Sequence, residues 1–184
     1  NHFIKIATEK KQSNYPVHLK FNTGLNRLGF NERETSKVIS LLNTTTAIKI
    51  TSVFSHLAAS EDLDEKNFSE AQINLFLSIS ESLSSKLDSQ PILHMCNTSG
   101  LLNFPKAQFD MVRCGIGLYG FSNILEEQKS FTPIATLKTV ISQIHHINVG
   151  ESIGYNRSFK STSPIITATL PIGHADGISR SYGN

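Results

Sequence analysis

Residues 17–30 read Val-His-Leu-Lys-Phe-Asn-Thr-Gly-Leu-Asn-Arg-Leu-Gly-Phe. The alternating apolar residues at the start predict a strand over 17–21, and the two glycines that follow predict a turn. Lys20 and Arg27 lie around this turn, seven positions apart. Two cations in such a place indicate a site for an anionic ligand, although charged residues at a strand end are also commonly just solvated.

Four further motifs follow in chain order. They are Val-Phe-Ser-His-Leu-Ala at 53–58, His-Met-Cys-Asn-Thr-Ser at 94–99, Phe-Asp-Met-Val-Arg-Cys-Gly-Ile-Gly-Leu-Tyr-Gly at 109–120, and Gly-Tyr-Asn at 154–156 joined to Leu-Pro-Ile-Gly-His-Ala-Asp-Gly at 170–177. In this order the five motifs resemble those of the alanine racemases, which are pyridoxal-phosphate enzymes built of a barrel and a β-domain. The chain departs from that pattern at Thr98, Cys114 and His174, where the family usually has serine, proline and tyrosine.

Composition limits the classes of protein to consider. The 184 residues have a net charge of +2 with both signs interspersed, so nothing indicates a nucleic-acid or membrane-surface partner. Cys96 and Cys114 are too few for a disulfide framework, and no apolar run is long enough to span a bilayer. We therefore expect a cytoplasmic protein, with no metal site.

Strand-like and helix-like segments alternate over the first two thirds of the chain. Strands are predicted at 17–21, 48–54, 92–95 and 111–113. Asn31 with Glu34, and Ser69 with Gln72, have the spacing of capping boxes, which predicts that a helix begins at each pair; a short helix is expected at 99–102. Such alternation predicts an α/β fold with a parallel sheet. The resemblance specifies the later half of a (β/α)8 barrel.

A β-rich pattern replaces this alternation near the end of the chain. Residues 136–149 and 165–170 read as strands, with no amphipathic helix between them. We therefore predict three parts: the C-terminal half of the cofactor-binding barrel at 1–122, a linker at 123–135, and the beginning of a mostly β C-terminal domain at 136–184. Residues 1–7 read as the end of a helix, so we expect a central and C-terminal fragment of a longer protein.

The resemblance assigns roles around the cofactor ring. It places Arg113 at the ring nitrogen of pyridoxal 5'-phosphate, where an arginine, which is always protonated, keeps that nitrogen unprotonated. It places His56 against the ring and His94 behind the arginine, with Asn97 as a supporting residue. From the residues alone, Arg113 could equally form a structural ion pair, and both histidines could be hydrogen-bonded core groups.

The cofactor phosphate needs hydroxyl groups and backbone amides. Thr98 or Ser99, with the amides near Gly115 and Ile116, would form such an anion cradle. Two glycines flanking Ile116 would let a ligand approach the backbone closely. A glycine-x-glycine sequence after a strand is also an ordinary turn, so the resemblance decides between the two interpretations.

The remaining roles concern the substrate. Tyr155 would be a catalytic acid and base, contributed across the interface of a homodimer, and His174 would lie at the substrate entrance. Arg27 would lie near the substrate carboxylate, with a carbamylated Lys20 holding it, since two unmodified cations at that distance would repel each other. From propensity alone, Tyr155 could also be a packed aromatic of the β-domain.

The resemblance implies an alanine racemase that interconverts L-alanine and D-alanine for cell-wall precursors by two-base proton transfer. The family's cofactor-binding lysine lies in a Lys-x-Asn-x-Tyr-Gly block, which no lysine of this chain matches. We therefore expect this piece alone to be inactive. The alternatives are a related racemase or decarboxylase of the same cofactor class, and a non-catalytic racemase-like module fused to a ligase. Decarboxylases of that class usually have an acid at the ring nitrogen, so Arg113 discriminates against them.

Overall fold

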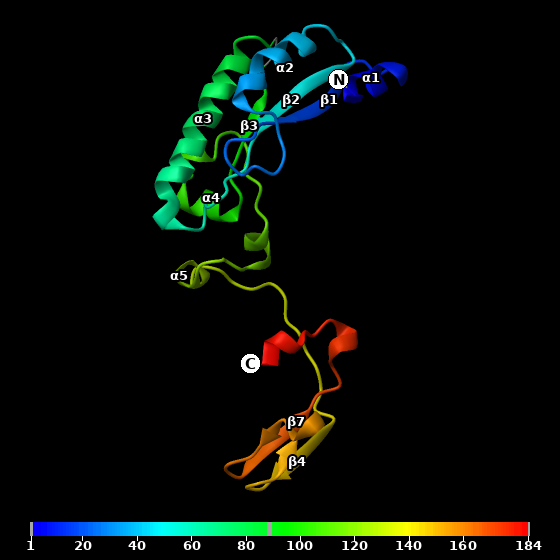
Figure 1. Cartoon of the computed structure of the whole chain (residues 1–184), viewed down its shortest axis with the longest axis vertical. Helices are drawn as coiled ribbons and strands as arrows, with labels where there is room; N and C mark the ends of the chain where they lie inside the picture. Colours follow the sequence, from blue (N-terminus) through cyan, green and yellow to red (C-terminus); the bar gives the residue numbers. More distant parts are fainter. Residues whose placement is uncertain (1, 88–89, 184) are drawn as a thin grey trace. The chain divides into compact units, whose positions relative to one another are not determined.

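The computed structural model describes residues 2–87 and 90–183, which form two compact units. The first unit is Asn1–Ile134 and the second is Ala135–Asn184 (Figure 1). Among the described residues, no helix is both long and apolar enough to cross a membrane. The exact boundaries predicted from the sequence, at 1–122, 123–135 and 136–184, remain a proposal.

The first unit contains a parallel sheet in the strand order β1-β2-β3. Its strands are β1 (Tyr15–Lys20), β2 (Ile48–Phe54) and β3 (Ile92–His94), and its helices are α1 (His2–Glu9), α2 (Thr35–Leu42), α3 (Lys66–Ser84), α4 (Thr98–Asn103) and α5 (Leu125–Gln128). Short 3-10 helices lie at Glu32–Glu34, Leu63–Glu65, Pro105–Ala107 and Ile116–Tyr119. The predicted alternation of strands and helices is confirmed here.

The two faces of this sheet have different chemistry. One face packs against α2 and α3, which lie next to each other in Figure 1, through fully buried side chains such as Val53, Phe76 and Leu83. Successive residues of a strand point to opposite faces. The other face therefore presents a set of polar and aromatic groups: His18, Lys20, Ser52, Phe54 and His94.

The predicted helix start at Ser69 is wrong. Helix α3 begins at Lys66, and both Ser69 and Gln72 are buried inside it. The cap lies upstream, where the Asp62 side chain accepts a hydrogen bond from the Asp64 amide at 3.0 Å. The capping box predicted at Asn31 and Glu34 forms, because the Glu34 carboxylate accepts from the Asn31 amide at 2.9 Å. It caps the short 3-10 helix Glu32–Glu34, which precedes α2.

The predicted strand at 111–113 is reduced to one bridge. Met111 pairs with His94, and the Arg113 amide donates to Cys96 O at 2.9 Å. No further strand pairs with this segment among the described residues, so it forms the edge of the sheet and its pairing is limited to the one bridge.

The second unit is small and mostly β. It contains two antiparallel pairs, β4 (Gln143–Ile147) with β7 (Ile165–Thr169), and β5 (Ser152–Ile153) with β6 (Phe159–Lys160). Further 3-10 helices lie at Tyr155–Arg157, His174–Asp176 and Arg180–Gly183. The long strand predicted at 136–149 is shorter than expected, because β7 is the partner of β4 in the described chain and pairs with only five residues of it.

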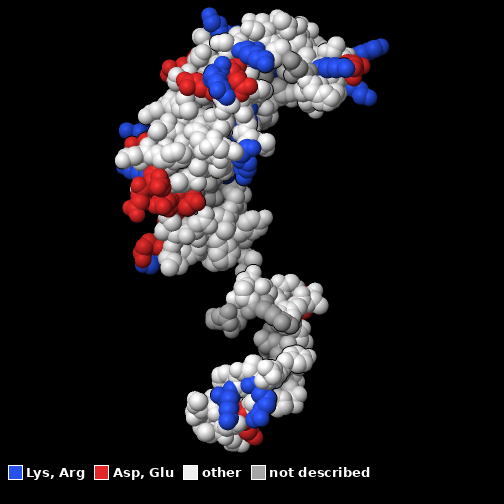
Figure 2. All heavy atoms as spheres, in the orientation of Figure 1, with Lys and Arg blue, Asp and Glu red and all other residues white. Residues whose placement is uncertain are grey.

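The described ion pairs all lie on the surface. They are Lys5–Glu9, Lys66–Glu70 and Lys129–Glu126, and each has well-exposed side chains. Figure 2 shows both signs of charge on the drawn face of the first unit. Pairs of this kind contribute little to stability, so the core described above holds the unit together.

Candidate functional site

Four of the predicted site residues meet at one edge of the sheet. Lys20, Phe54 and His94 form one rung across the C-terminal ends of β1, β2 and β3, since Lys20 pairs with Phe54 and Phe54 with His94. His56 follows β2 directly, and Arg113 follows the bridge beside β3. In α/β folds this edge of a parallel sheet is where ligands bind.

Arg113 is the centre of the hydrogen bonds at this edge. Its Nη1 donates to His94 Nδ1, and its Nη2 donates to His56 Nδ1 at 2.9 Å. Nη2 also donates to the backbone carbonyls of Ser55 at 2.8 Å and Met95 at 3.2 Å. Among the described residues, the Nε–H of Arg113 has no protein acceptor, so one edge of the fixed guanidinium remains available to a ligand.

Both histidines are neutral in this environment. Burial lowers the pKa of His94 to about 4, and the charge of Arg113 adds to the effect. Burial and the positive charge of Arg113 also lower the pKa of His56. Because a guanidinium only donates, each Nδ1 must be the accepting nitrogen and each proton must sit on Nε2.

Lys20, Arg27 and Arg113 make this edge positive. None of the three belongs to an ion pair in the described part of the chain. Lys20 Nζ lies 5.7 Å and Arg113 Cζ 5.4 Å from the centroid of the Phe54 ring, which stacks on His94. Burial, then Arg27 and Arg113, lower the pKa of Lys20. Uncompensated positive charge of this kind favours an anionic ligand.

The loop from Phe21 to Phe30 presents Arg27. Asn22 organises this loop, because its Oδ1 accepts from the amides of Gly24 at 3.2 Å and Asn26 at 2.9 Å. Arg27 itself is exposed. The loop closes where the Phe30 amide donates to Lys20 O at 2.9 Å, so the loop returns to the end of β1.

The predicted phosphate cradle is partly assembled. Thr98 Oγ1 accepts from the amides of Gly115 at 3.0 Å and Gly117 at 3.2 Å. A Cβ at Gly117 would lie 2.6 Å from the Thr98 methyl group, so that position requires glycine, whereas a Cβ at Gly115 would meet open space. Ser99 is buried and Ile116 is exposed, and the predicted role of these residues in binding a phosphate remains a proposal.

Asn97 has a structural function in this arrangement. Its Oδ1 accepts from the Gly100 amide at 2.8 Å, which caps α4, and from Ser60 Oγ at 2.8 Å. The cap holds the segment that carries Thr98. Asn97 therefore supports the cradle through the backbone.

Tyr155 and His174 belong to the second unit. Tyr155 is 97% exposed and begins a 3-10 helix after Gly154, whose φ of +79° favours glycine. His174 is also exposed, and its Nδ1 lies 2.7 Å from Ile178 O. Their predicted roles in the reaction remain proposals.

Sequence reasoning assigned no function to Phe54, Ser55 or Gln72. Phe54 stacks on His94, and the Ser55 carbonyl fixes Arg113. Buried Gln72 accepts from the Ala58 amide at 2.9 Å and so holds the loop after His56. Phe54 and Ser55 had a usable signal, since both lie in the motif at 53–58 that contains His56.

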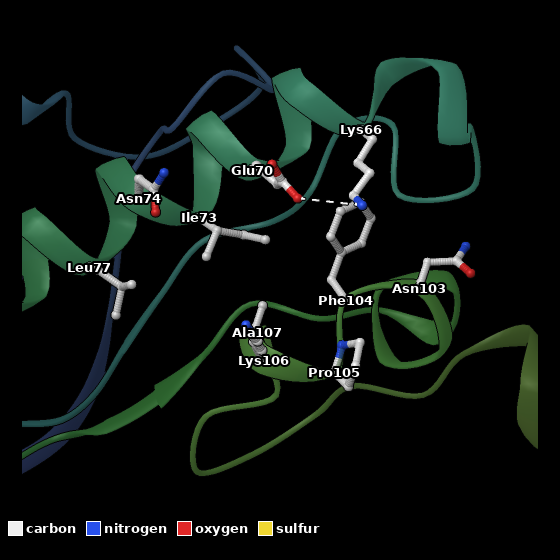
Figure 3. A pocket seen from close by; sticks show the side chains of 10 residues that line it. All are labelled: Lys66, Glu70, Ile73, Asn74, Leu77, Asn103, Phe104, Pro105, Lys106 and Ala107. Carbon is white, nitrogen blue, oxygen red and sulfur yellow. Dashed lines mark ion pairs between the residues drawn. The ribbon is translucent and has the colours of Figure 1, made fainter.

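A separate pocket of about 480 Å3 lies between α3 and residues 103–107 (Figure 3). Its lining combines the Lys66–Glu70 ion pair with apolar groups such as Phe104. It includes none of the predicted site residues. The edge described above is therefore the candidate site.

The fold and this edge define a barrel-type α/β protein with a following β-domain. Two family models match the chain, the alanine racemase N-terminal domain at residues 3–123 and the alanine racemase C-terminal domain at residues 134–184. The chain therefore belongs to the alanine racemase family, whose members are pyridoxal-phosphate-dependent racemases. Its fold is part of the family's TIM barrel together with part of the β-domain.

Individual relatives agree with this assignment. The chain is 34% identical to an alanine racemase of Clostridium tetani over 169 residues, covering 90% of this chain and 43% of the relative. It is 34% identical to one of Treponema denticola over 185 residues, covering 98% and 48%. A crystal structure of alanine racemase from Bartonella henselae with covalently bound pyridoxal phosphate matches with a TM-score of 0.75 at 27% identity, covering 98% and 48%. The chain thus spans about half the length of the curated relatives it matches.

Proposed function

We propose that the protein to which this chain belongs is an alanine racemase, which uses pyridoxal 5'-phosphate to interconvert L-alanine and D-alanine for cell-wall precursors. The observation that carries the proposal is the guanidinium of Arg113, which His94, His56 and two backbone carbonyls hold in place. Its Nε–H has no acceptor among the described residues and is available to a ligand. An arginine in this place disfavours a decarboxylase, in which an acid would be expected.

The residues present fit this cofactor. A pyridine nitrogen needs one donor, for which the Nε–H of Arg113 is suited, and a phosphate needs hydroxyl and amide donors. The Thr98 hydroxyl and the amides near Gly115 and Ile116 are the candidates, and the Gly115 amide would have to exchange its bond to Thr98 Oγ1 for one to the phosphate. The positive charge of Arg27 suits a substrate carboxylate. The donor set therefore matches the chemistry of the cofactor at both of its ends.

When bound, the cofactor supplies an electron-accepting ring that makes the α-hydrogen of alanine acidic. Arg113 would donate to the ring nitrogen and keep a proton off it, which would limit electron withdrawal and disfavour transamination. His56, with its proton on Nε2, can donate to a phenolate oxygen and so stabilise the ionised form of a tyrosine. We assign that tyrosine to Tyr155, as the acid and base on one face of the substrate.

The proposal includes a homodimer in which Tyr155 comes from the partner subunit, and His174 near the substrate entrance. The family's cofactor-binding lysine would serve as the base on the opposite face. Cys96 and Cys114 are free cysteines, which suits a reducing compartment, so we place the protein in the cytoplasm.

Replacement of Tyr155 tests the proposal. In the full-length protein, Tyr155→Phe should abolish interconversion of the enantiomers, because each base serves one face only. Exchange of the α-hydrogen with deuterated solvent should survive for one enantiomer, measured by proton NMR.

Tyr15→Phe, which removes a hydroxyl at the far end of β1, is the matched control and should retain both activities. Normal exchange of both enantiomers in Tyr155→Phe would show that Tyr155 is not a base. Failure of the unmodified protein to interconvert the enantiomers would refute the function itself.

A further inference from the structure

A second series of hydrogen bonds continues from His94 into the middle of the sheet. His94 Nε2 lies 3.0 Å from Ser52 Oγ, and Ser52 Oγ lies 2.6 Å from His18 Nδ1. Ser52 is only 1% exposed, so its hydroxyl depends on these two rings. The mechanism above uses neither Ser52 nor His18.

A bulge in β2 turns Ser52 toward the histidines. Val17 pairs with Ile50 and His18 pairs with Ser52, so Thr51 is an extra residue of β2. Strict alternation would put Ile50 and Ser52 on the same face. Instead, Ile50 lies in the hydrophobic core while Ser52 contacts both rings. Bulges commonly redirect a side chain next to a functional site.

The Thr51 side chain secures this bulge. Its Oγ1 donates to Val17 O at 3.1 Å, on the neighbouring strand at the point where the register shifts. The extra residue is thus held by a hydrogen bond of its own, and the orientation of Ser52 is built into the sheet.

The guanidinium sets the direction of every hydrogen bond in the series. Arg113 only donates, so His94 accepts at Nδ1 and carries its proton on Nε2. That proton is donated to Ser52 Oγ. The Ser52 hydroxyl, having accepted one hydrogen bond, donates its own proton to His18 Nδ1. In this arrangement each donor of the series meets an acceptor.

We propose that Ser52 and His18 are positioning residues, which hold His94 in the one tautomer and ring orientation that accepts from Arg113. Their importance for catalysis rests on the proposed function, in which Arg113 contacts the cofactor ring. The hydrogen-bond geometry itself does not depend on that function.

Loss of the Ser52 hydroxyl would leave the Nε2–H of His94 without an acceptor in a buried position. An unsatisfied buried donor costs about 1–3 kcal/mol, which disfavours the observed tautomer. In the opposite tautomer, N–H of His94 would face N–H of Arg113. Arg113 would then lose one of the contacts that fix it.

The tautomer can be measured without the cofactor. The full-length protein would be labelled with 15N-histidine, and its ring nitrogens observed by solid-state NMR, with His94→Gln identifying the His94 signals. We expect a neutral ring protonated at Nε2. In Ser52→Ala we expect the Nε2 signal to shift or to split between tautomers.

Three variants serve as comparisons. Ser52→Thr keeps the hydroxyl and should keep the His94 signals of the unmodified protein. His18→Asn keeps an acceptor at the place of Nδ1, whereas His18→Leu removes it, so only His18→Leu should resemble Ser52→Ala. Ser80→Ala removes another buried hydroxyl, which bonds Phe76 O within α3, and should leave His94 unchanged.

Kinetics supply a second measurement. The unmet hydrogen bond corresponds to a fall in kcat of about 5- to 140-fold for Ser52→Ala, at nearly constant KM for alanine. Unchanged His94 signals in Ser52→Ala would overturn the proposal, as would an equal effect of Ser80→Ala. A protein that shows the tautomer change but does not racemise alanine would refute the proposed function and leave the positioning intact.

Discussion

At the scale of single residues, the guanidinium of Arg113 organises its neighbours because it has donors only. Two imidazole rings accept from it, and their neutral state follows from burial beside a permanent positive charge. The same charge acts on Lys20, whose pKa is lowered mainly by burial and then by Arg27 and Arg113. A lowered pKa increases the fraction of neutral amine at neutral pH.

We predict that this neutral amine of Lys20 is carbamylated. The amine would attack carbon dioxide, form an N–C bond and release a proton, and the resulting anion would hold Arg27. With 13C-bicarbonate, the full-length protein should show a carbamate carbon signal, which decreases as the pH falls because the amine becomes protonated.

Lys20→Met should remove this signal, while the other lysines serve as internal controls. A spectrum of the unmodified protein without a carbamate signal at neutral pH would contradict the assignment.

At the scale of elements, buried polar side chains connect α3 to the loops of the site. Gln72 Oε1 accepts from the Ala58 amide at 2.9 Å, and its Nε2 lies 3.4 Å from Thr23 Oγ1 and from His56 O. Helix α3 thereby contacts both the loop that follows His56 and the start of the loop that carries Arg27. The core helix contributes to the shape of the site as well as to stability.

Replacement of Gln72 measures this connection. Gln72→Leu should lower the free energy of unfolding by about 1–3 kcal/mol, because the part-buried Ala58 amide loses its acceptor. Urea unfolding of the full-length protein gives the value. Asn74→Leu, at an exposed position of the same helix, should change it little. Equal effects of the two variants would show that the Gln72 hydrogen bonds contribute nothing specific.

At the scale of the whole molecule, the proposed site needs residues from both units. Arg113 lies in the first unit and Tyr155 in the second. In the proposed homodimer, the two residues of one site come from different subunits. Inactive variants of each should therefore complement one another.

Mixed dimers test this arrangement. Tyr155→Phe and Arg113→Ala subunits are each expected to be inactive alone. A dimer of one with the other has one site with both residues intact. After random exchange of subunits, about a quarter of the normal activity should return. Mixed dimers that form, as shown by mass spectrometry, yet remain inactive would refute a shared site.

Much of this molecule could be predicted from local sequence patterns. The alternation of strands and helices and the strand at 48–54 follow from periodicity, because hydrophobic spacing and turn residues act within a few positions. Motif order, through the family resemblance that it carries, predicted that His56 and His94 lie near Arg113. The resemblance to the alanine racemases rests on the same motifs. The family models confirm it.

Only the tertiary structure decided the start of α3, the loss of the strand at 111–113 and the position of Ser52. Ser69 and Gln72 have the spacing of a capping box, yet both lie inside α3. The buried Gln72 side chain accepts from the amide of Ala58, fourteen residues earlier in the chain. Strand length depends on a partner strand, which residues 111–113 have at one position only. Ser52 faces His94 because the pairing of β1 with β2 places an extra residue at Thr51. Each of these depends on contacts between residues far apart in the chain, which local spacing does not encode.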